Sequence, residues 1–129
     1  MDTSNELLEH RYDAYLAQCP CRPLLDVIAN KWTALIVGAL QEREHRFGEL
    51  RRHVEGISQK VLTANLRALE RNGFVSRRVY PTSPPSVGYA LTTLGRSLAP
   101  PLVAVREWTE DHLDEVEDAR TRYDAAVPR

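Results

Sequence analysis

The chain has 129 residues, 43% of them hydrophobic, and a formal net charge of −1. A chain of this length buries about two-thirds of its unfolded surface, so we expect one domain over residues 1–129 with a core of its own. The longest apolar stretch, residues 34–40, is far too short to span a bilayer, and acidic residues stand where a signal peptide needs a basic start. We therefore expect a cytoplasmic protein with no membrane partner and with cysteines that are reduced at rest.

Apolar residues at helical spacing begin near the start of the chain and predict a helical extension over residues 1–18. A second apolar stripe, between Trp32 and Leu40, predicts a core helix in which Trp32 packs inside and Asn30 is the N-cap. The apolar face of the N-terminal extension consists of Leu8, Tyr12, Tyr15 and Leu16.

Two cysteines, Cys19 and Cys21, flank Pro20 between these predicted helices. Arg22 is adjacent, and a guanidinium together with the positive end of the following helix stabilises a thiolate, the reactive form of cysteine. A bond between the two cysteines of one chain would close a small, strained loop, so a link across a dimer or a mixed disulfide with a small thiol should form more easily. Quinones or aldehydes would alkylate the same thiolate, and inert packing of both thiols is the alternative.

Residues 46–73 predict a helix-turn-helix. Gly56 follows the first apolar stripe, at a point where helices often end in a left-handed residue. Ser58 stands in the N-cap position of the second helix, which ends at the Asn-Gly pair of residues 72–73. Two helices joined by a turn of three or four residues that contains glycine form a DNA-reading unit. The two apolar faces consist of Phe47, Leu50 and Val54, then of Leu62, Leu66 and Leu69.

The face of the second helix that lies opposite the leucines carries small and basic side chains, which suit the major groove of DNA. A helical hairpin with a solvated outer face is the alternative interpretation of this segment. The residues that we expect to contact DNA here are Arg46, Ser58, Gln59, Lys60, Thr63, Ala64 and Arg67.

Alternating residues after the helix-turn-helix predict a β-hairpin wing, with strands over residues 75–80 and 87–91 and a proline-stiffened turn between them. A wing beside a recognition helix lies along the DNA backbone or enters a neighbouring minor groove. Arg77 and Arg78 supply positive charge for phosphates, and Ser86 is a further candidate for DNA contact.

The C-terminal part of the chain predicts a long amphipathic helix, which Pro100 and Pro101 should kink or restart. A small domain does not easily bury two terminal amphipathic helices against itself, so they favour a two-fold homodimer whose recognition helices lie about 34 Å apart. A helix that folds back on its own domain is the alternative. The residues assigned to dimerisation are Leu8, Tyr12, Leu102, Val105 and Trp108.

Charge is divided unevenly along the chain. Residues 43–78 contain nine arginines and lysines against four glutamates, a local +5. Residues 107–124 contain eight acidic residues against two arginines, a local −6. The basic middle suits a polyanion, and the acidic tail must point away from it.

The ordered motifs from Cys19 to about His112 resemble those of the HxlR-type winged helix-turn-helix regulators of bacteria, relatives of the MarR group. The resemblance implies a DNA-binding transcriptional regulator, and Cys19 matches the position at which redox-sensing members carry their thiol. The chain departs from the pattern at Ser86 and Gly88, which replace an arginine and a glutamate usual in the wing, and at Cys21, an additional thiol. The matching segments are residues 19–20 (CP), 25–28 (LDVI), 31–32 (KW), 47–51 (FGELR), 56–63 (GISQKVLT), 69–70 (LE), Gly73, 80–81 (YP), Pro85, Tyr89, 91–92 (LT) and 94–95 (LG).

Together these features predict a mainly α protein with a small β-hairpin wing (α+β). Residues 1–18 would form the N-terminal helical extension, residues 19–92 the DNA-binding core and wing, and residues 93–129 the dimerisation helix and tail. We expect a sequence-specific regulator that binds double-stranded DNA as a homodimer on a two-fold operator. It should be a repressor controlled by a small oxidant or electrophile at Cys19, with Cys21 as the second redox candidate.

A metal- or small-molecule-responsive regulator is the alternative, in which Cys19 and Cys21 are structural or bind zinc or copper with His10 or His112. No histidine lies at ligand spacing beside the cysteines, so we assign no metal site and no cofactor. We expect no enzyme, because the sequence has no Ser-His-Asp spacing, paired carboxylates in a pocket-forming context or glycine-rich phosphate loop. A third alternative is a winged domain that binds protein instead of DNA. Its binding would lack the steep salt dependence that is typical of DNA binding.

Overall fold

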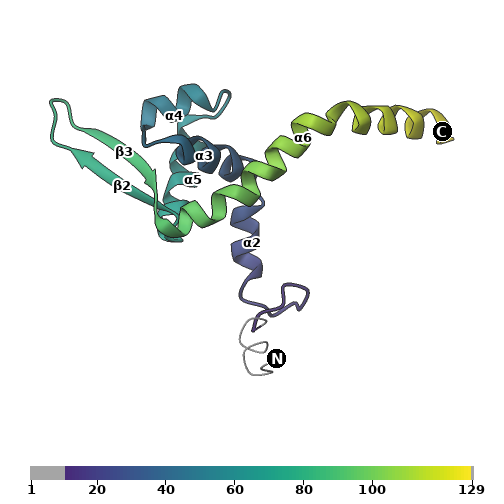
Figure 1. Ribbon diagram of the computed structural model, residues 1–129, viewed down its shortest axis with the longest axis horizontal. Coiled ribbons are helices and arrows are strands. Elements are labelled where there is room, and N and C mark those ends of the chain that lie inside the picture. Colours follow the sequence, from purple (N-terminus) through teal and green to yellow (C-terminus); the bar gives the residue numbers. More distant parts are fainter. Residues whose placement is uncertain (1–10, 129) are drawn as a thin grey trace.

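A computed structural model describes residues 11–128 as a group of helices, a small sheet and a long C-terminal helix. The elements, in chain order, are α2 (Arg22–Ile28), α3 (Lys31–Glu42), β1 (His45–Arg46), α4 (Phe47–His53), α5 (Gln59–Arg71), β2 (Val75–Tyr80), β3 (Ser86–Leu91) and α6 (Thr93–Ala126). Helix α3 is central, since it contacts α2, α4, α5, α6 and β3. Figure 1 shows the β2–β3 hairpin projecting from one side of the helices, while α6 and the N-terminal segment extend away in other directions.

The sheet has the strand order β1–β3–β2, with both pairs antiparallel. β2 and β3 form the wing, in which Arg77 lies opposite Tyr89 and Val75 lies opposite Leu91. The predicted winged helix-turn-helix is therefore confirmed. The sheet also has a third strand that the sequence pattern did not reveal, because β1 is only two residues long and cannot show an alternation.

The predicted apolar faces meet in one core. Leu62, Leu66 and Leu69 of α5 are buried, as are Leu50 of α4 and Ile36 of α3. Burying a side chain of this size stabilises the fold by about 1.5–3 kcal/mol. Because the leucine face of α5 packs in this core, the opposite face of the helix is exposed to solvent.

Local signals in the sequence set the ends of the helices, as predicted. The Oγ of Ser58 accepts a hydrogen bond from the Val61 N–H at 3.1 Å, and the Oδ1 of Asn30 accepts one from the Trp32 N–H at 2.8 Å. A cap of this kind stabilises a helix by about 1 kcal/mol. Gly56 adopts a φ of +91°, the left-handed region that favours glycine. Trp32 itself is half-buried and packs against the core.

The N-terminal segment differs from its prediction. Residues 11–18 form turns rather than a helix. The Oδ1 of Asp13 accepts a hydrogen bond from the Tyr15 N–H at 3.0 Å, a local alternative to helical hydrogen bonding, and Pro20 disfavours helical backbone in the residue before it. Tyr12 is exposed on this segment, and Leu8 lies outside the described residues.

A second difference concerns α6, which continues for 34 residues through Pro100 and Pro101 without the predicted restart. Both prolines are exposed, while Ala99 and Leu102 beside them are buried in the core. Packing therefore holds the helix together across two residues that cannot donate a backbone hydrogen bond. No single helix within residues 11–128 is long and apolar enough to cross a membrane, although α2 and α3, bent by 66°, have the length and composition as a pair.

The end of α5, the base of the wing and the start of α6 meet at one junction. The hydroxyl of Thr92 accepts a hydrogen bond from the Gly95 N–H at 3.0 Å and donates one to the Gly73 carbonyl at 2.6 Å. The Thr92 N–H donates to the Phe74 carbonyl at 3.0 Å. Gly95 packs against the same carbonyl so closely that an added Cβ would lie 2.0 Å from the Phe74 oxygen.

Gly95→Ala should therefore destabilise the protein by about 2–3 kcal/mol, because relief of this clash requires a backbone shift. Gly38→Ala is the matched control, since its Cβ would meet nothing nearer than Val103 Cγ2 at 3.9 Å and alanine is the better helix former. Urea unfolding followed by circular dichroism measures both free energies. Equal stabilities for the two variants would contradict the close packing at Phe74.

Candidate nucleic-acid interface

The exposed face of α5 carries most of the residues predicted to contact DNA. Gln59, Lys60, Ala64 and Arg67 are exposed, and Thr63 is half-buried among them. These five side chains line one shallow concavity. The N-cap serine before them is also exposed, although its oxygen already accepts the capping hydrogen bond. A helix face of small, polar and basic side chains has the chemistry that major-groove readout requires.

The two neighbouring arginines of the wing lie on opposite faces of β2, because side chains alternate along a strand. Arg77 faces α5, where its Nε lies 3.9 Å from the Oε2 of Glu70. It lines a cleft together with Arg67 and Tyr89. Burial raises the pKa of the Tyr89 phenol. Arg78 points to the other face, so the structure divides the positive charge of the wing between its two sides.

A cluster of polar side chains, the Tyr80 cluster, surrounds the last residue of β2. The guanidinium carbon of Arg46 lies 3.8 Å from the ring centroid of Tyr80, and that of Arg78 lies 5.2 Å from it, both within the range of cation–π attraction. The Tyr80 hydroxyl donates to the Oε2 of Glu44 at 2.5 Å, and Arg46 Nη1 donates to the Oγ of Ser86. The hydrogen bond to Glu44, followed by burial, raises the pKa of Tyr80. The cluster thus gathers three of the residues predicted to contact DNA.

Glu44 and Tyr80 are the members of this cluster that the sequence did not reveal. Gly88 makes room for them, since an added Cβ would lie 3.0 Å from both Glu44 Cδ and Tyr80 Cε2. A glycine inside a strand indicates the close approach of another group. The departure of Gly88 from the family pattern was therefore the sequence signal for this cluster. The cluster holds the Arg46 and Arg78 side chains in place, which lowers the entropic cost of ordering them in any interaction that they make.

Cys19 and Cys21 are joined as a disulfide, with their Cα atoms 5.3 Å apart. The structure thus joins the two cysteines within one chain, whereas a link across a dimer or a mixed disulfide was expected from the sequence to form more easily. The chain turns here, the Arg22 N–H donating to the Cys19 carbonyl at 3.2 Å, and the turn brings the Cα atoms within the separation that disulfides span. In this disulfide form the guanidinium of Arg22 donates to the carbonyls of Ala14 and Tyr15, at 2.8 and 2.9 Å.

Two residues assigned to dimerisation are exposed on α6. Val105 is 61% exposed and Trp108 is 55% exposed, with the Trp108 ring stacked on His112 at a centroid distance of 4.4 Å. Leu102 is only 7% exposed and packs in the core of its own chain, which corrects its assignment to a dimer interface. The first part of α6 therefore belongs to the domain, and the second part presents the unpartnered apolar side chains.

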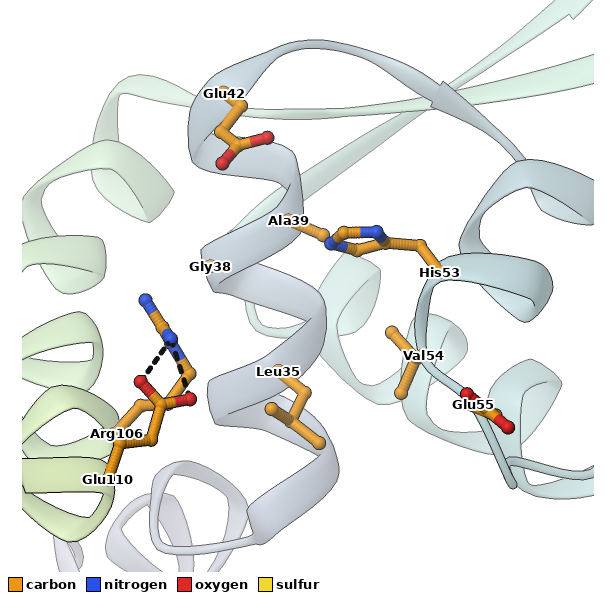
Figure 2. A pocket seen from close by; sticks show the side chains of 9 residues that line it. All are labelled: Leu35, Gly38, Ala39, Glu42, His53, Val54, Glu55, Arg106 and Glu110. Carbon is orange, nitrogen blue, oxygen red and sulfur yellow. Dashed lines mark hydrogen bonds and ion pairs between the residues drawn. The ribbon is translucent and has the colours of Figure 1, made fainter.

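A crevice separates α6 from the turn between α4 and α5, across the surface of α3 (Figure 2). Gly38 and Ala39 of α3 lie on its floor. Arg106 and Glu110 face it from α6, joined by hydrogen bonds of 2.9 and 3.0 Å, and His53 points toward Ala39 from the other side. No group of histidine, cysteine and acidic side chains within residues 11–128 has the arrangement of a metal site.

Comparison with known proteins places this fold in a family. A family model described as HxlR-like helix-turn-helix matches residues 27–117, which are 91 of the 129 residues. The chain belongs to this family. HxlR-like proteins are transcriptional regulators and not enzymes. The HTH-type transcriptional regulator YtfH of Escherichia coli (strain K12) is 43% identical over 102 residues, which cover 79% of this chain and 81% of YtfH.

Solved structures of similar proteins share the fold. The transcriptional regulator ytfH from Salmonella typhimurium superposes with a TM-score of 0.81 at 39% identity, over 85% of this chain and 98% of that one. The redox regulator HypR in its oxidized form superposes with a TM-score of 0.66 at 42% identity, over 72% of this chain and 96% of that one. The winged helix-turn-helix of this chain is therefore similar to that of a redox regulator.

Within this HxlR-like domain, Tyr80→Leu should weaken DNA binding by about 1 kcal/mol, or roughly fivefold, because Arg46 and Arg78 lose the ring that holds them. Tyr80→Phe is the matched control, since it keeps the ring and loses only the hydrogen bond to Glu44. Fluorescence anisotropy with a labelled duplex at fixed salt measures both affinities. Wild-type affinity for Tyr80→Leu would mean that the ring does not organise the two arginines for DNA.

Proposed function

We propose that this protein is a cytoplasmic, sequence-specific repressor that binds a two-fold DNA operator as a homodimer, and that modification of Cys19 controls its affinity. The observation that carries the proposal is the exposed face of α5, whose five small, polar and basic side chains line one concavity beside the wing. The local charge of residues 43–78, nine basic against four acidic residues, supports a polyanionic partner.

In the proposed complex α5 lies in the major groove, with Gln59 and Lys60 of its first turn nearest the base edges. Lys60 and Arg67 make no ion pair within the described part of the chain, so both are available to DNA. Arg46 and Arg78 of the Tyr80 cluster would contact phosphates, which fix the register of the protein on the duplex without reading its sequence.

Lys60→Ala and Arg67→Ala should each weaken operator binding, by about 1–3 kcal/mol where the side chain makes a bidentate contact to a base. Arg122→Ala, at an exposed position in the acidic part of α6, is the control and should bind like wild type. The measurement is a titration at fixed salt of DNA fragments that the protein enriches from a genomic library. Unchanged affinity in both α5 variants would overturn the proposed recognition face.

The second part of α6 supports the homodimer. Besides Val105 and Trp108, Leu113 and Tyr123 are exposed there, and a solvated helix with such a stripe is stabilised when a second copy covers it. A two-fold axis would place two copies of α5 about one DNA turn, or 34 Å, apart. The acidic residues of the same helix would then lie away from the duplex.

Trp108→Glu should convert a dimer into monomers, because it places a charge in the proposed apolar interface. Thr121→Glu adds the same charge at an exposed position about 160° around the helix from Val105, on the opposite face, and should leave the dimer intact. Light scattering after size-exclusion chromatography at micromolar concentration measures both masses. A wild-type mass of one chain would end the proposal of a dimer.

Thiol control is supported by the match of Cys19 to the redox-sensing position and by the similarity to the redox regulator HypR. Wild-type protein should change its DNA affinity after treatment with diamide or a quinone, and dithiothreitol should reverse the diamide effect. Cys19→Ser should bind DNA like reduced wild type and ignore both reagents. If wild-type protein keeps its full DNA affinity after mass spectrometry shows complete modification of Cys19, the proposed control is wrong.

A small-molecule-responsive regulator is a second candidate, favoured by the crevice between α3 and α6. A ligand there would contact both the DNA-binding domain and the helix proposed to dimerise. The double variant Cys19→Ser, Cys21→Ser separates the two mechanisms. A compound that releases DNA from this variant would act without the thiols and would favour the crevice.

A further inference from the structure

We infer that Cys19 and Cys21 of one chain form a reversible dithiol–disulfide pair, and that closing it fixes the N-terminal segment, residues 11–18, against α2. The oxidant is a two-electron oxidant of the hydroperoxide class. The regulatory role of this pair rests on the proposed thiol control of DNA binding, whereas formation of the disulfide does not depend on DNA. It names Cys21 as the partner of Cys19, so neither a second chain nor a small thiol takes part in the bond.

The turn that contains both cysteines favours closure within one chain. Hydrogen bonds hold it on both sides, from the Cys19 N–H to the Leu16 carbonyl at 3.0 Å and from the Leu25 N–H to the Cys21 carbonyl at 2.9 Å. Pro20 fixes its own φ between the two cysteines. With one residue between the two cysteines in the chain and a turn at that point, the two sulfur atoms lie close together, and an intramolecular reaction has an effective concentration that a partner chain or a cellular thiol must exceed to compete.

The oxidation balances without any further reactant. The thiolate of one cysteine attacks the peroxide, an S–O bond forms as the O–O bond breaks, and the hydroxide released takes up a proton to become water. The thiolate of the other cysteine then attacks the sulfenic sulfur, the S–S bond forms as the S–O bond breaks, and a second water leaves. Two thiols and one hydrogen peroxide thus give one disulfide and two waters, and a dithiol reductant reverses the change.

The pair lies where the N-terminal segment joins the domain. Arg22 bridges the join, since its guanidinium donates to the carbonyls of Ala14 and Tyr15 while its backbone begins α2. Helix α2 in turn contacts α3, the central helix of the fold. The segment presents Tyr12 and Tyr15 to solvent, and Tyr15 is 93% exposed. When the disulfide opens, the turn between the segment and α2 loses its covalent restraint, and the hydrogen bonds of Arg22 and of the turn then hold the segment.

The bond itself is tested by treating reduced wild-type protein with hydrogen peroxide and blocking remaining thiols with N-ethylmaleimide. Mass spectrometry after proteolysis then measures the peptide of residues 12–31, which contains both cysteines. We expect its mass to be about 2 Da below that of the reduced peptide, the mass of two hydrogens, and we expect no adduct on it. We also expect a single-chain band on a non-reducing gel. In Cys21→Ser, Cys19 should instead be trapped as a sulfenic acid or link two chains. A wild-type product that is mainly a linked dimer or a small-thiol adduct would overturn the inference.

The structural consequence is tested by amide hydrogen exchange in reduced and oxidised wild-type protein. The amides of Cys19 and Arg22, whose hydrogen bonds define the turn, should exchange several-fold more slowly when the disulfide is closed. The amides of the double variant Cys19→Ser, Cys21→Ser should exchange as fast as those of reduced wild type, with and without oxidant. Equal rates in reduced and oxidised wild type would overturn the restraint. If the disulfide forms and slows exchange while DNA affinity stays constant, the inference stands and the proposed thiol control of DNA binding fails.

Discussion

The backbone carbonyl of Phe74 is the point on which the arrangement of the functional elements depends. Phe74 lies between the end of α5 and the start of β2. Its carbonyl accepts a hydrogen bond from the N–H of Thr92, the N-cap of α6. Gly95 packs against it at a distance that no larger residue tolerates. Helix α5, the wing and α6, the helix proposed to dimerise, therefore meet at one close-packed junction.

The helix-turn-helix and the wing could be predicted from the sequence because their determinants are local. The leucine stripe of α5, the caps at Asn30 and Ser58 and the glycine at position 56 each act within a few residues. The exposed face of α5 follows from the buried one. Its residues could thus be named without knowing which other parts of the chain lie nearby.

The remaining features depend on contacts between distant segments, which periodicity does not report. Tyr80 and Glu44 are 36 residues apart in the sequence and meet because β1 pairs with β3. Leu102 and Trp108 were both predicted to lie on the apolar stripe of α6, yet only Leu102 packs in the core, because the two positions lie about 120° apart around the helix. The N-terminal segment has a helical pattern, but the Asp13 turn and the anchor at Arg22 use its backbone groups differently. In each case tertiary or local side-chain hydrogen bonding overrides an apolar pattern.

The account as a whole requires that two copies of α5 read one DNA duplex with two-fold symmetry. Hydroxyl-radical footprinting of a DNA fragment that the protein enriches from a genomic library tests this most directly. The account predicts two protected segments on one face of the duplex, with centres about 34 Å, or one helical turn, apart. A single protected segment, or protection that is uniform along the fragment, would contradict it.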